Sequence, residues 1–281
     1  MIIANTIKEV RLQIKAWMKE GKSIGFVPTM GFLHEGHQSL IERAKKENDK
    51  VVVSVFVNPT QFGPTEDLES YPRDFEKDTM LCEMTGADLI FHPDAKEMYE
   101  KGASTLIHVE GLTNALCGKS RPTHFGGVCL VVSKLFHIVS PDRAYFGEKD
   151  AQQLAVIKRM VKDLNFDIEI VGCPIIREVD GLAKSSRNAY LNTQERAAAT
   201  ILNKALTKGK ETILAGETNV VKVKNEITEI ICKEPLAKID YVEIVDFDTI
   251  APVKSIKGNI LVAVAVFIGK TRLIDNFIIQ A

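Results

Sequence analysis

The sequence predicts an α/β fold, with a Rossmann-like, doubly wound parallel sheet followed by a smaller α+β domain. Three observations lead to this prediction. Residues 50–58 are an almost unbroken run of valine and phenylalanine, which is typical of a strand buried on both faces of a parallel sheet. Up to about residue 175, such apolar runs alternate with segments of helical periodicity, as they do in βαβ units. Beyond that point two helical segments precede three apolar strands, which is an α+β order.

The elements of the first part follow from the spacing of apolar residues. Ile7, Val10 and Ile14 recur at helical spacing before Gly21, which predicts a first helix over 6–20. The same reasoning predicts further helices over 36–48, 74–85, 126–139 and 151–164. Strands are expected between the helices, over 23–29, 50–58, 87–92, 143–146 and 167–171.

The second part is expected to be a separate, smaller domain. Two helices are predicted first, over 193–215 and 219–233. Three strands follow, over 239–246, 259–269 and 272–280. We therefore expect a first domain of residues 1–175 and a second domain of residues 176–281.

The charge balance argues against a polyanion as partner. Lys and Arg total 36 and Asp and Glu total 37, a formal net charge of −1, whereas a nucleic-acid binder normally has a basic excess. The five cysteines are scattered without a CxxC pair, as is typical of reduced, buried residues. The longest apolar stretch is about half of a membrane span, and the amino terminus has no signal-peptide pattern. We expect a cytoplasmic protein without membrane or nucleic-acid partners.

Segment 30–37, MGFLHEGH, joins a predicted strand to a predicted helix. Helix N-termini in this position bind anions through exposed backbone N–H groups, and glycines let the backbone approach a ligand closely. Three interpretations remain open for His34 and His37: a phosphate site, two partly exposed turn residues, or a metal site. The metal site has the least support, because the spacing is not HExxH and no third ligand is apparent.

Segment 58–64 directly follows the most apolar predicted strand. Its Asn58 and Gln61 amides could hold a substrate hydroxyl or carboxylate. A plain turn would explain the Asn-Pro and Gly-Pro pairs equally well, so both interpretations stay open.

Segment 145–153 also lies between a predicted strand and a predicted helix. Lys149 could meet a phosphate or carboxylate, and Asp150 could accept hydrogen bonds from ribose hydroxyls. The alternative is a solvated helix start.

Segment 176–188 contains Lys184-Ser185-Ser186-Arg187, in which two cations flank two hydroxyls. This grouping suits a polyphosphate, because it combines charged and neutral donors. A structural turn is the alternative.

Five segments together resemble the pantoate–β-alanine ligase family. They occur in the family's order between residues 26 and 192: FVPTMGFLHEGHQSL, VVVSVFVNPTQFGP, DLESYPRDFEKD, AYFGEKDAQQL and IIREVDGLAKSSRNAYL. The HEGH turn alone would be modest evidence, whereas the ensemble is specific. The resemblance implies membership of the nucleotidyltransferase group, in which an HxGH turn and a KMSKS-like loop both bind ATP.

The resemblance also implies the site residues. His34 and His37 would face the phosphates, with His37 as proton donor and both as catalytic residues. Gln61 and Gln153 would hold pantoate, with Gln61 also near β-alanine. ATP would be bound by Met30, Gly31, Phe32, Leu33, His34, Glu35, Gly36, His37, Gly147, Glu148, Lys149, Asp150, Ile176, Lys184, Ser185, Ser186 and Arg187. Many relatives have Met in place of Lys184 and Val in place of Ile176, and the added charge of Lys184 could alter ATP affinity.

The implied reaction joins pantoate to β-alanine with ATP, giving pantothenate, AMP and pyrophosphate through a pantoyl adenylate. Mg²⁺ would accompany the phosphates, although the sequence shows no dedicated set of Mg²⁺ ligands. The first domain would bind nucleotide and pantoate, and the second would act as a lid over the ATP site. The family also suggests a homodimer.

Two other functions share parts of this pattern. An adenylyltransferase that makes a dinucleotide would have the HEGH turn without needing the paired glutamines. A non-catalytic nucleotide-binding regulator would bind ATP and release no pyrophosphate when pantoate is added.

Overall fold

The computed structural model describes residues 1–64 and 66–281, and these form two compact units. The first unit consists of Met1–Val109, Arg121–Glu148 and Val156–Pro174. The second consists of Glu110–Ser120, Lys149–Ala155 and Ile175–Ala281. The second unit therefore includes two short stretches that come earlier in the chain than its main part.

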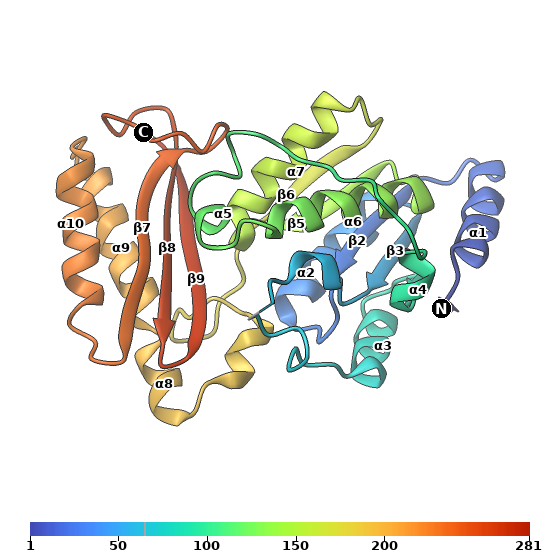
Figure 1. The fold of residues 1–281 in the computed structure, drawn as a ribbon, viewed down its shortest axis with the longest axis horizontal. Helices are drawn as coiled ribbons and strands as arrows, with labels where there is room; N and C mark the ends of the chain where they lie inside the picture. The colour runs from blue at the N-terminus through green and yellow to red at the C-terminus, as the bar shows by residue number, and fades with distance from the viewer. Residues whose placement is uncertain (65) are drawn as a thin grey trace. The chain divides into compact units, whose positions relative to one another are not determined.

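Among the described residues, the first unit contains a six-stranded parallel sheet, which confirms the predicted Rossmann-like fold (Figure 1). The strand order is β1-β4-β3-β2-β5-β6. The order reverses between β2 and β5, and such sheets bind ligands beyond the carboxyl ends of the strands at this point. The strands are β1 (Ile2–Ala4), β2 (Ile24–Thr29), β3 (Lys50–Val55), β4 (Leu89–Phe91), β5 (Arg143–Gly147) and β6 (Glu169–Cys173).

Helices cover both faces of this sheet. Phe26 and Val27 are neighbours on β2 and point to opposite faces, because side chains alternate along a strand. Val27 packs in a cluster with Ile41 of α2, whereas the ring of Phe26 lies 6.4 Å from that of Phe136 on α6. The helical elements of this unit are α1 (Ile7–Lys19), α2 (Glu35–Glu47), η1 (Pro59–Gln61), α3 (Phe75–Met84), α4 (Ala95–Met98) and α6 (His124–Val139).

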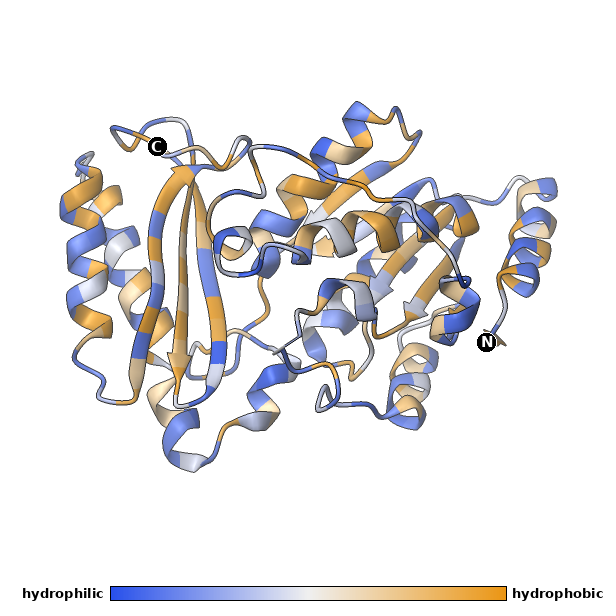
Figure 2. Ribbon diagram, viewed as in Figure 1, coloured by the Kyte–Doolittle hydropathy of each residue, from blue (hydrophilic) through white to orange (hydrophobic). Residues whose placement is uncertain are grey.

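The second unit combines an antiparallel sheet with helices, which agrees with the predicted α+β order. The sheet order is β7-β8-β9, and α9 and α10 pack against it (Figure 1). Figure 2 shows β8 as apolar along most of its length, and its side chains pack with Leu202 and Ile227 of the two helices. The elements are α5 (Cys117–Ser120), η3 (Ser186–Tyr190), α8 (Thr193–Ala198), α9 (Ile201–Leu214), α10 (Val220–Ile231), β7 (Ala237–Asp246), β8 (Asn259–Ile268) and β9 (Thr271–Gln280).

Two further elements, η2 (Glu148–Asp150) and α7 (Ala151–Asp163), have residues in both units. No helix among the described residues is long and apolar enough to cross a membrane.

Two predicted elements differ clearly from the structure, and three short elements, β1, α4 and α5, were not predicted. The predicted strand over 50–58 ends at Val55, because Asn58 caps the 3₁₀ turn that follows. The predicted helix over 193–215 is divided into α8 and α9, and at the break the Thr200 hydroxyl donates to the Ala197 carbonyl (2.9 Å). Such a side-chain bond competes with regular helix hydrogen bonding. The edge strand β1 was not predicted, since three residues carry too little periodicity to reveal a strand.

Candidate active site

The chain leaves β2 through a tight turn that requires glycine. Gly31 has φ +83°, and Phe32 also lies in the left-handed region with φ +51°. A Cβ at Gly31 would lie 2.9 Å from Asp78 Oδ2 and 3.0 Å from Val55 Cγ1. Glycine therefore provides both the backbone conformation and the close approach of α3.

Asp78 of α3 anchors this turn, a role that sequence reasoning missed. Its carboxylate accepts the backbone N–H of Phe32 (2.9 Å) and of Leu33 (2.6 Å). Only 1% of Asp78 is exposed. Burial raises the pKa of its carboxyl, while the two backbone N–H groups act in the opposite direction. The anchor fixes the backbone immediately before the two histidines.

The two histidines cap α2, and this capping fixes their tautomers. His34 is the N-cap residue, and its Nδ1 accepts the backbone N–H of Gly36 (3.1 Å). Nδ1 of His37 accepts the backbone N–H of His34 (3.3 Å), and the ring centroids are 4.2 Å apart. An imidazole that accepts at Nδ1 carries its proton on Nε2. Both rings thus offer Nε2–H donors at a helix N-terminus, which itself favours an anion.

Gln61 lies in η1, and its side chain reaches the same turn. The residue is 7% exposed, and its side-chain Nε2 is 3.0 Å from Met30 Sδ. Its backbone carbonyl accepts hydrogen bonds from Nδ1 of His124 (3.0 Å) and Nη2 of Arg121 (3.4 Å). The structure therefore brings a predicted pantoate residue into contact with the predicted ATP-binding turn.

The close packing of η1 on α6 depends on a second glycine. A Cβ at Gly127 would lie 2.3 Å from the Thr60 carbonyl oxygen and 2.6 Å from Gln61 Cα. At the adjacent Gly126 the nearest atom would be 3.7 Å away, at ordinary contact distance. Gly127 is therefore what allows Gln61 to lie against α6.

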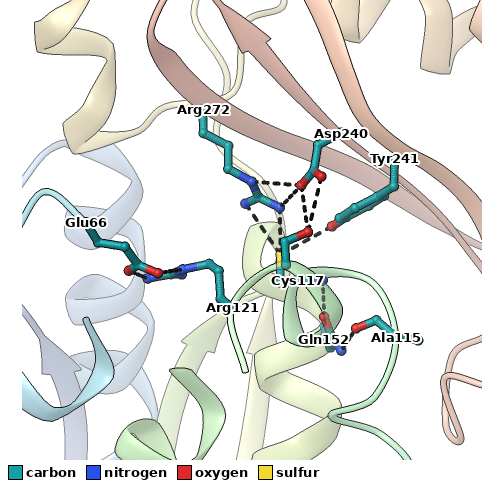
Figure 3. Close-up of polar contacts among 9 residues, drawn as sticks. Glu66, Ala115, Cys117, Arg121, Gln152, Asp240, Tyr241 and Arg272 are labelled. Carbon is teal, nitrogen blue, oxygen red and sulfur yellow. Dashed lines mark hydrogen bonds and ion pairs between the residues drawn. The ribbon is translucent and has the colours of Figure 1, made fainter. Parts of the chain in front are cut away.

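An ion pair borders η1. Figure 3 shows Arg121 donating to the Glu66 carboxylate through Nε (2.9 Å) and Nη2. Burial alone would raise the pKa of the Glu66 carboxyl, but the hydrogen bond and charge of Arg121 lower it. The pair is therefore ionised at neutral pH, and it holds a guanidinium beside the Gln61 carbonyl.

In the second unit, two adjacent glutamines at the start of α7 have different surroundings. Gln152 is buried, its Oε1 accepts the Cys117 N–H (2.9 Å), and its Nε2 donates to the Ala115 carbonyl (2.7 Å; Figure 3). The same Nε2 also donates to the Leu112 carbonyl (2.7 Å). This amide has no donor left for a ligand and ties segment 110–120 to α7. Gln153 is half-buried.

The neighbouring Lys149 and Asp150 lie in η2. The Lys149 carbonyl accepts a hydrogen bond from Asn276 Nδ2 (2.8 Å), which holds this turn to β9. Lys149 Nζ lies 3.9 Å from Asp150 Oδ2. Gly147 and Glu148, the preceding pair, belong to the first unit at the end of β5.

A short hairpin pairs two predicted residues that are eight positions apart. The Lys184 N–H donates to the Ile176 carbonyl (2.9 Å), and the Glu178 N–H donates to the Leu182 carbonyl (2.8 Å). Gly181 forms the turn with φ +91°. The Lys184 ammonium lies 2.9 Å from Glu178 Oε2. The hairpin thus places the predicted adenine residue beside the first predicted phosphate residue.

The remaining predicted phosphate residues begin η3. Ser185 is its N-cap, with Oγ accepting the Arg187 N–H (3.3 Å), and Ser186 is buried. The hairpin is fastened to β9 by Arg177, which donates twice to the buried Asp275 carboxylate (2.7 and 2.9 Å).

The predicted residues therefore form two sets. The first unit holds residues 30–37, Gln61, Gly147 and Glu148, and the second holds Lys149, Asp150, Gln153, Ile176 and residues 184–187. Within the ranges that the structure describes, no group of three or more His, Cys, Asp or Glu side chains could hold a metal ion.

Known proteins match this chain over nearly its whole length. A family model described as pantoate-beta-alanine ligase matches residues 2–278. The pantothenate synthetase of Clostridioides difficile (strain 630) is 66% identical over 276 residues, 98% of each chain. The crystal structure of pantothenate synthetase from Thermus thermophilus matches with a TM-score of 0.94 at 46% identity, covering 99% of both chains.

A further solved structure carries ligands. It is the pantoate-beta-alanine ligase of Francisella tularensis, described as complexed with beta-gamma ATP and beta-alanine. It matches with a TM-score of 0.79 at 38% identity, covering 99% of this chain and 97% of that one. On these matches, the chain belongs to the pantoate–β-alanine ligase family.

Proposed function

We propose that this ligase condenses pantoate with β-alanine and converts ATP to AMP and pyrophosphate, through a pantoyl adenylate. The observation that carries the proposal is the contact between the histidine-capped turn and Gln61 in the first unit. Two histidines with Nε2–H donors cap a helix N-terminus, and Gln61 contacts the same turn through Met30. The Francisella tularensis relative, whose structure holds an ATP compound and β-alanine, supports both substrates.

In the first step, a carboxylate oxygen of pantoate attacks the α-phosphorus of ATP. The bond from that phosphorus to the bridging oxygen breaks, and pyrophosphate leaves. Negative charge grows on the phosphate oxygens, and fixed donors stabilise such charge more in the transition state than in the ground state. His34 and His37 supply these donors, with His37 as the proposed proton donor.

In the second step, the β-alanine amine attacks the acyl carbon of pantoyl adenylate. The new C–N bond forms, the bond to the AMP oxygen breaks, and the amine loses a proton. Gln61 and Gln153 hold pantoate for both steps, and Gln61 lies near β-alanine. The main contribution of these residues is to orient the reactants.

The second unit contributes further nucleotide contacts in this proposal. Residues 184–187, Lys149 and Asp150 are proposed to bind ATP phosphates and ribose, and Ile176 to contact the adenine. The proposal also keeps a first domain of residues 1–175, expected from the change in element order near residue 175, that binds nucleotide and pantoate. Residues 176–281 would then form a lid domain. Lys184 offers a point charge and Arg187 a planar fork of donors, which together suit a polyphosphate.

We further propose that Mg²⁺ enters with ATP, held by phosphate oxygens and water. Mg²⁺ usually keeps several waters and takes few protein ligands. The proposal includes a homodimer in the cytoplasm, as the family suggests.

The decisive assay measures the release of AMP and pyrophosphate while each substrate is omitted in turn. We expect sustained release of both products only when pantoate, β-alanine and ATP are all present, with one pantothenate formed per AMP. Pantoate and ATP alone should release no more than one pyrophosphate per active site and no AMP. An adenylyltransferase that makes dinucleotides would release pyrophosphate without AMP. A regulator would release neither, and either result would overturn the proposal.

Calorimetry separates the two proposed pantoate residues from the rest of the site. Gln61→Ala and Gln153→Ala should lose pantoate binding and keep ATP binding. Gln38→Ala is the matched control, because the Gln38 amide donates its hydrogen bond to the exposed Glu42 side chain (2.8 Å). Unchanged pantoate affinity in either site variant would remove that glutamine from the proposal.

A further inference from the structure

We infer that Asn58 and Tyr99 are positioning residues that fix the orientation of the Gln61 amide, so that Gln61 offers N–H donors to the oxygen atoms of pantoate. This inference rests on the proposed function, because it takes Gln61 as a pantoate residue. The proposed function states that Gln61 contacts pantoate. The inference adds which way the oxygen and nitrogen of its amide point.

The orientation of the Asn58 amide is set by backbone groups. Asn58 is 1% exposed, its Oδ1 accepts the Thr60 N–H (3.4 Å), and its Nδ2 donates to the Gly127 carbonyl (3.2 Å). A backbone N–H cannot accept and a backbone carbonyl cannot donate. Reversing the Asn58 amide would therefore oppose donor to donor and acceptor to acceptor, at a buried position where unpaired groups are costly.

Two hydroxyl groups reinforce this orientation. Tyr99, the C-cap residue of α4, donates its O–H to Asn58 Oδ1 at 2.7 Å. The Thr60 hydroxyl donates to the same oxygen at 3.0 Å. Burial raises the pKa of Tyr99, so its phenol stays protonated and remains a donor at neutral pH.

Asn58 passes its orientation to Gln61. The second N–H of Asn58 Nδ2 donates to Gln61 Oε1 at 3.0 Å, so this oxygen is committed as an acceptor. The Gln61 Nε2 must then lie on the other side of the amide, where it is 3.0 Å from Met30 Sδ. A thioether is a weak acceptor. A carboxylate or hydroxyl oxygen of pantoate is a stronger one, and it would replace the sulfur contact.

The most direct test reverses the polarity at Asn58 without changing its shape. Asn58→Asp keeps an acceptor toward Tyr99 and Thr60 but places a carboxylate oxygen against Gln61 Oε1. We expect pantoate affinity to fall by at least about tenfold near pH 8, the scale expected when a buried acceptor faces an acceptor. ATP affinity should stay within about twofold of wild type, since no ATP contact changes.

A change of pH separates polarity from packing in this variant. The carboxyl oxygen that replaces Nδ2 is buried against Gln61 Oε1 and the Gly127 carbonyl, two acceptors that favour a protonated carboxyl and so raise its pKa. Near pH 6 it should take up a proton and donate to Gln61 again, so that part of the pantoate affinity returns. Wild-type affinity should change little over the same range. A loss of affinity that does not respond to pH would assign Asn58 a packing role and overturn the inference.

Tyr99→Phe provides a milder variant in which folding is not at risk. Loss of one hydrogen bond to Asn58 should raise the KM for pantoate about three- to tenfold, with kcat and the KM for ATP nearly unchanged. Tyr241→Phe, which removes a hydroxyl that contacts Cys117 Sγ (3.3 Å) in the second unit, is the matched control and should leave the KM for pantoate unchanged. Equal KM values for Tyr99→Phe and wild type would count against the inference.

Gln61→Ala distinguishes a failure of the proposed pantoate role of Gln61 from a failure of the positioning role of Asn58 and Tyr99. If this variant binds pantoate as wild type does, the proposed role of Gln61 fails. If it loses pantoate while Asn58→Asp binds pantoate normally near pH 8, only the positioning role fails.

Discussion

The turn after β2 and the hairpin before η3 are both proposed to bind ATP, yet the groups proposed to contact it are held by different forces. The turn is fixed through its backbone, by the buried Asp78 carboxylate and by the two capping histidines. The base of the hairpin is likewise held, by its backbone hydrogen bonds and by Arg177 on the buried Asp275. Its Lys184 and Asp180 side chains are instead held by partly exposed ion pairs with Glu178 and Arg196.

This difference indicates distinct roles in binding. Hydrogen bonds from buried backbone groups hold one geometry, because breaking them leaves polar atoms without partners. Partly exposed ion pairs contribute only about 0–1 kcal/mol, so their charged groups can exchange one anion for another at little cost. The backbone of the turn is therefore preformed. In the proposed function, the Lys184 side chain releases Glu178 and rearranges when ATP binds.

Removal of the His37 ring should have the largest effect. His37→Ala deletes a donor from the preformed turn, and turnover should fall by about 10²–10³, the usual loss for one donor to a charged transition state. Steady-state kinetics measures this loss. The exposed His108 supplies the control, since His108→Ala should keep wild-type turnover. Near-full activity in His37→Ala would remove this residue from the mechanism.

Asp78→Asn should have the next largest effect, although Asp78 is not proposed to touch substrate. The amide can accept only one of the two backbone N–H groups, so the turn loses its fixed geometry. One unsatisfied buried donor costs about 1–3 kcal/mol, which corresponds to roughly 10- to 100-fold in kcat/KM for ATP. Asp74→Asn is the control, because Asp74 caps α3 and Asn caps equally well. Wild-type kinetics in Asp78→Asn would show that the anchor is dispensable.

A pair of adjacent glycines tests the packing of η1. Gly127→Ala places a methyl group against the Thr60 carbonyl, and overpacking of this kind costs about 1–3 kcal/mol of stability. The displaced η1 should also weaken pantoate binding. Gly126→Ala meets no such neighbour and should be neutral or more stable, because alanine is the better helix former. Equal unfolding free energies for the two variants would contradict the close approach.

Lys184→Met should have the smallest effect and act only through the hairpin. It removes one charge and its pair with Glu178, so the KM for ATP should rise about two- to fivefold, and less at high salt. Thermal unfolding should be nearly unchanged. A large fall in stability would show that the ion pair holds the hairpin in place.

The sequence revealed the fold well because periodicity and turn residues are local signals. The long strands and helices of both units were predicted with shifted ends, whereas the short elements β1, α4 and α5 were not. The larger shifts have local causes such as the Asn58 cap and the Thr200 hydroxyl. The residues that hold the site in place, such as Asp78 and Asn58, could not be predicted from local signals. Asp78 is 45 residues from Leu33, and Asn58 is 69 residues from Gly127. No spacing rule connects such partners, which only the folded sheet brings together.

The adjacent glutamines of α7 are a second case in which local sequence signals could not identify the residue that binds a ligand. Spacing alone gives no reason to prefer Gln153 over Gln152, and only the resemblance made that choice. The structure supplies a physical reason, because the Gln152 amide is occupied by Cys117, Leu112 and Ala115.

Hydrogen exchange with and without ATP tests most directly whether the turn is preformed and whether the hairpin segment rearranges. The backbone amides of residues 30–37 should be equally protected in both states, because buried groups already hold that turn. The amides of residues 184–187 should gain protection when ATP binds, as expected for a segment that rearranges around its ligand. Equal protection of residues 184–187 in the two states, or a large gain at residues 30–37, would contradict a preformed turn and an adaptable hairpin.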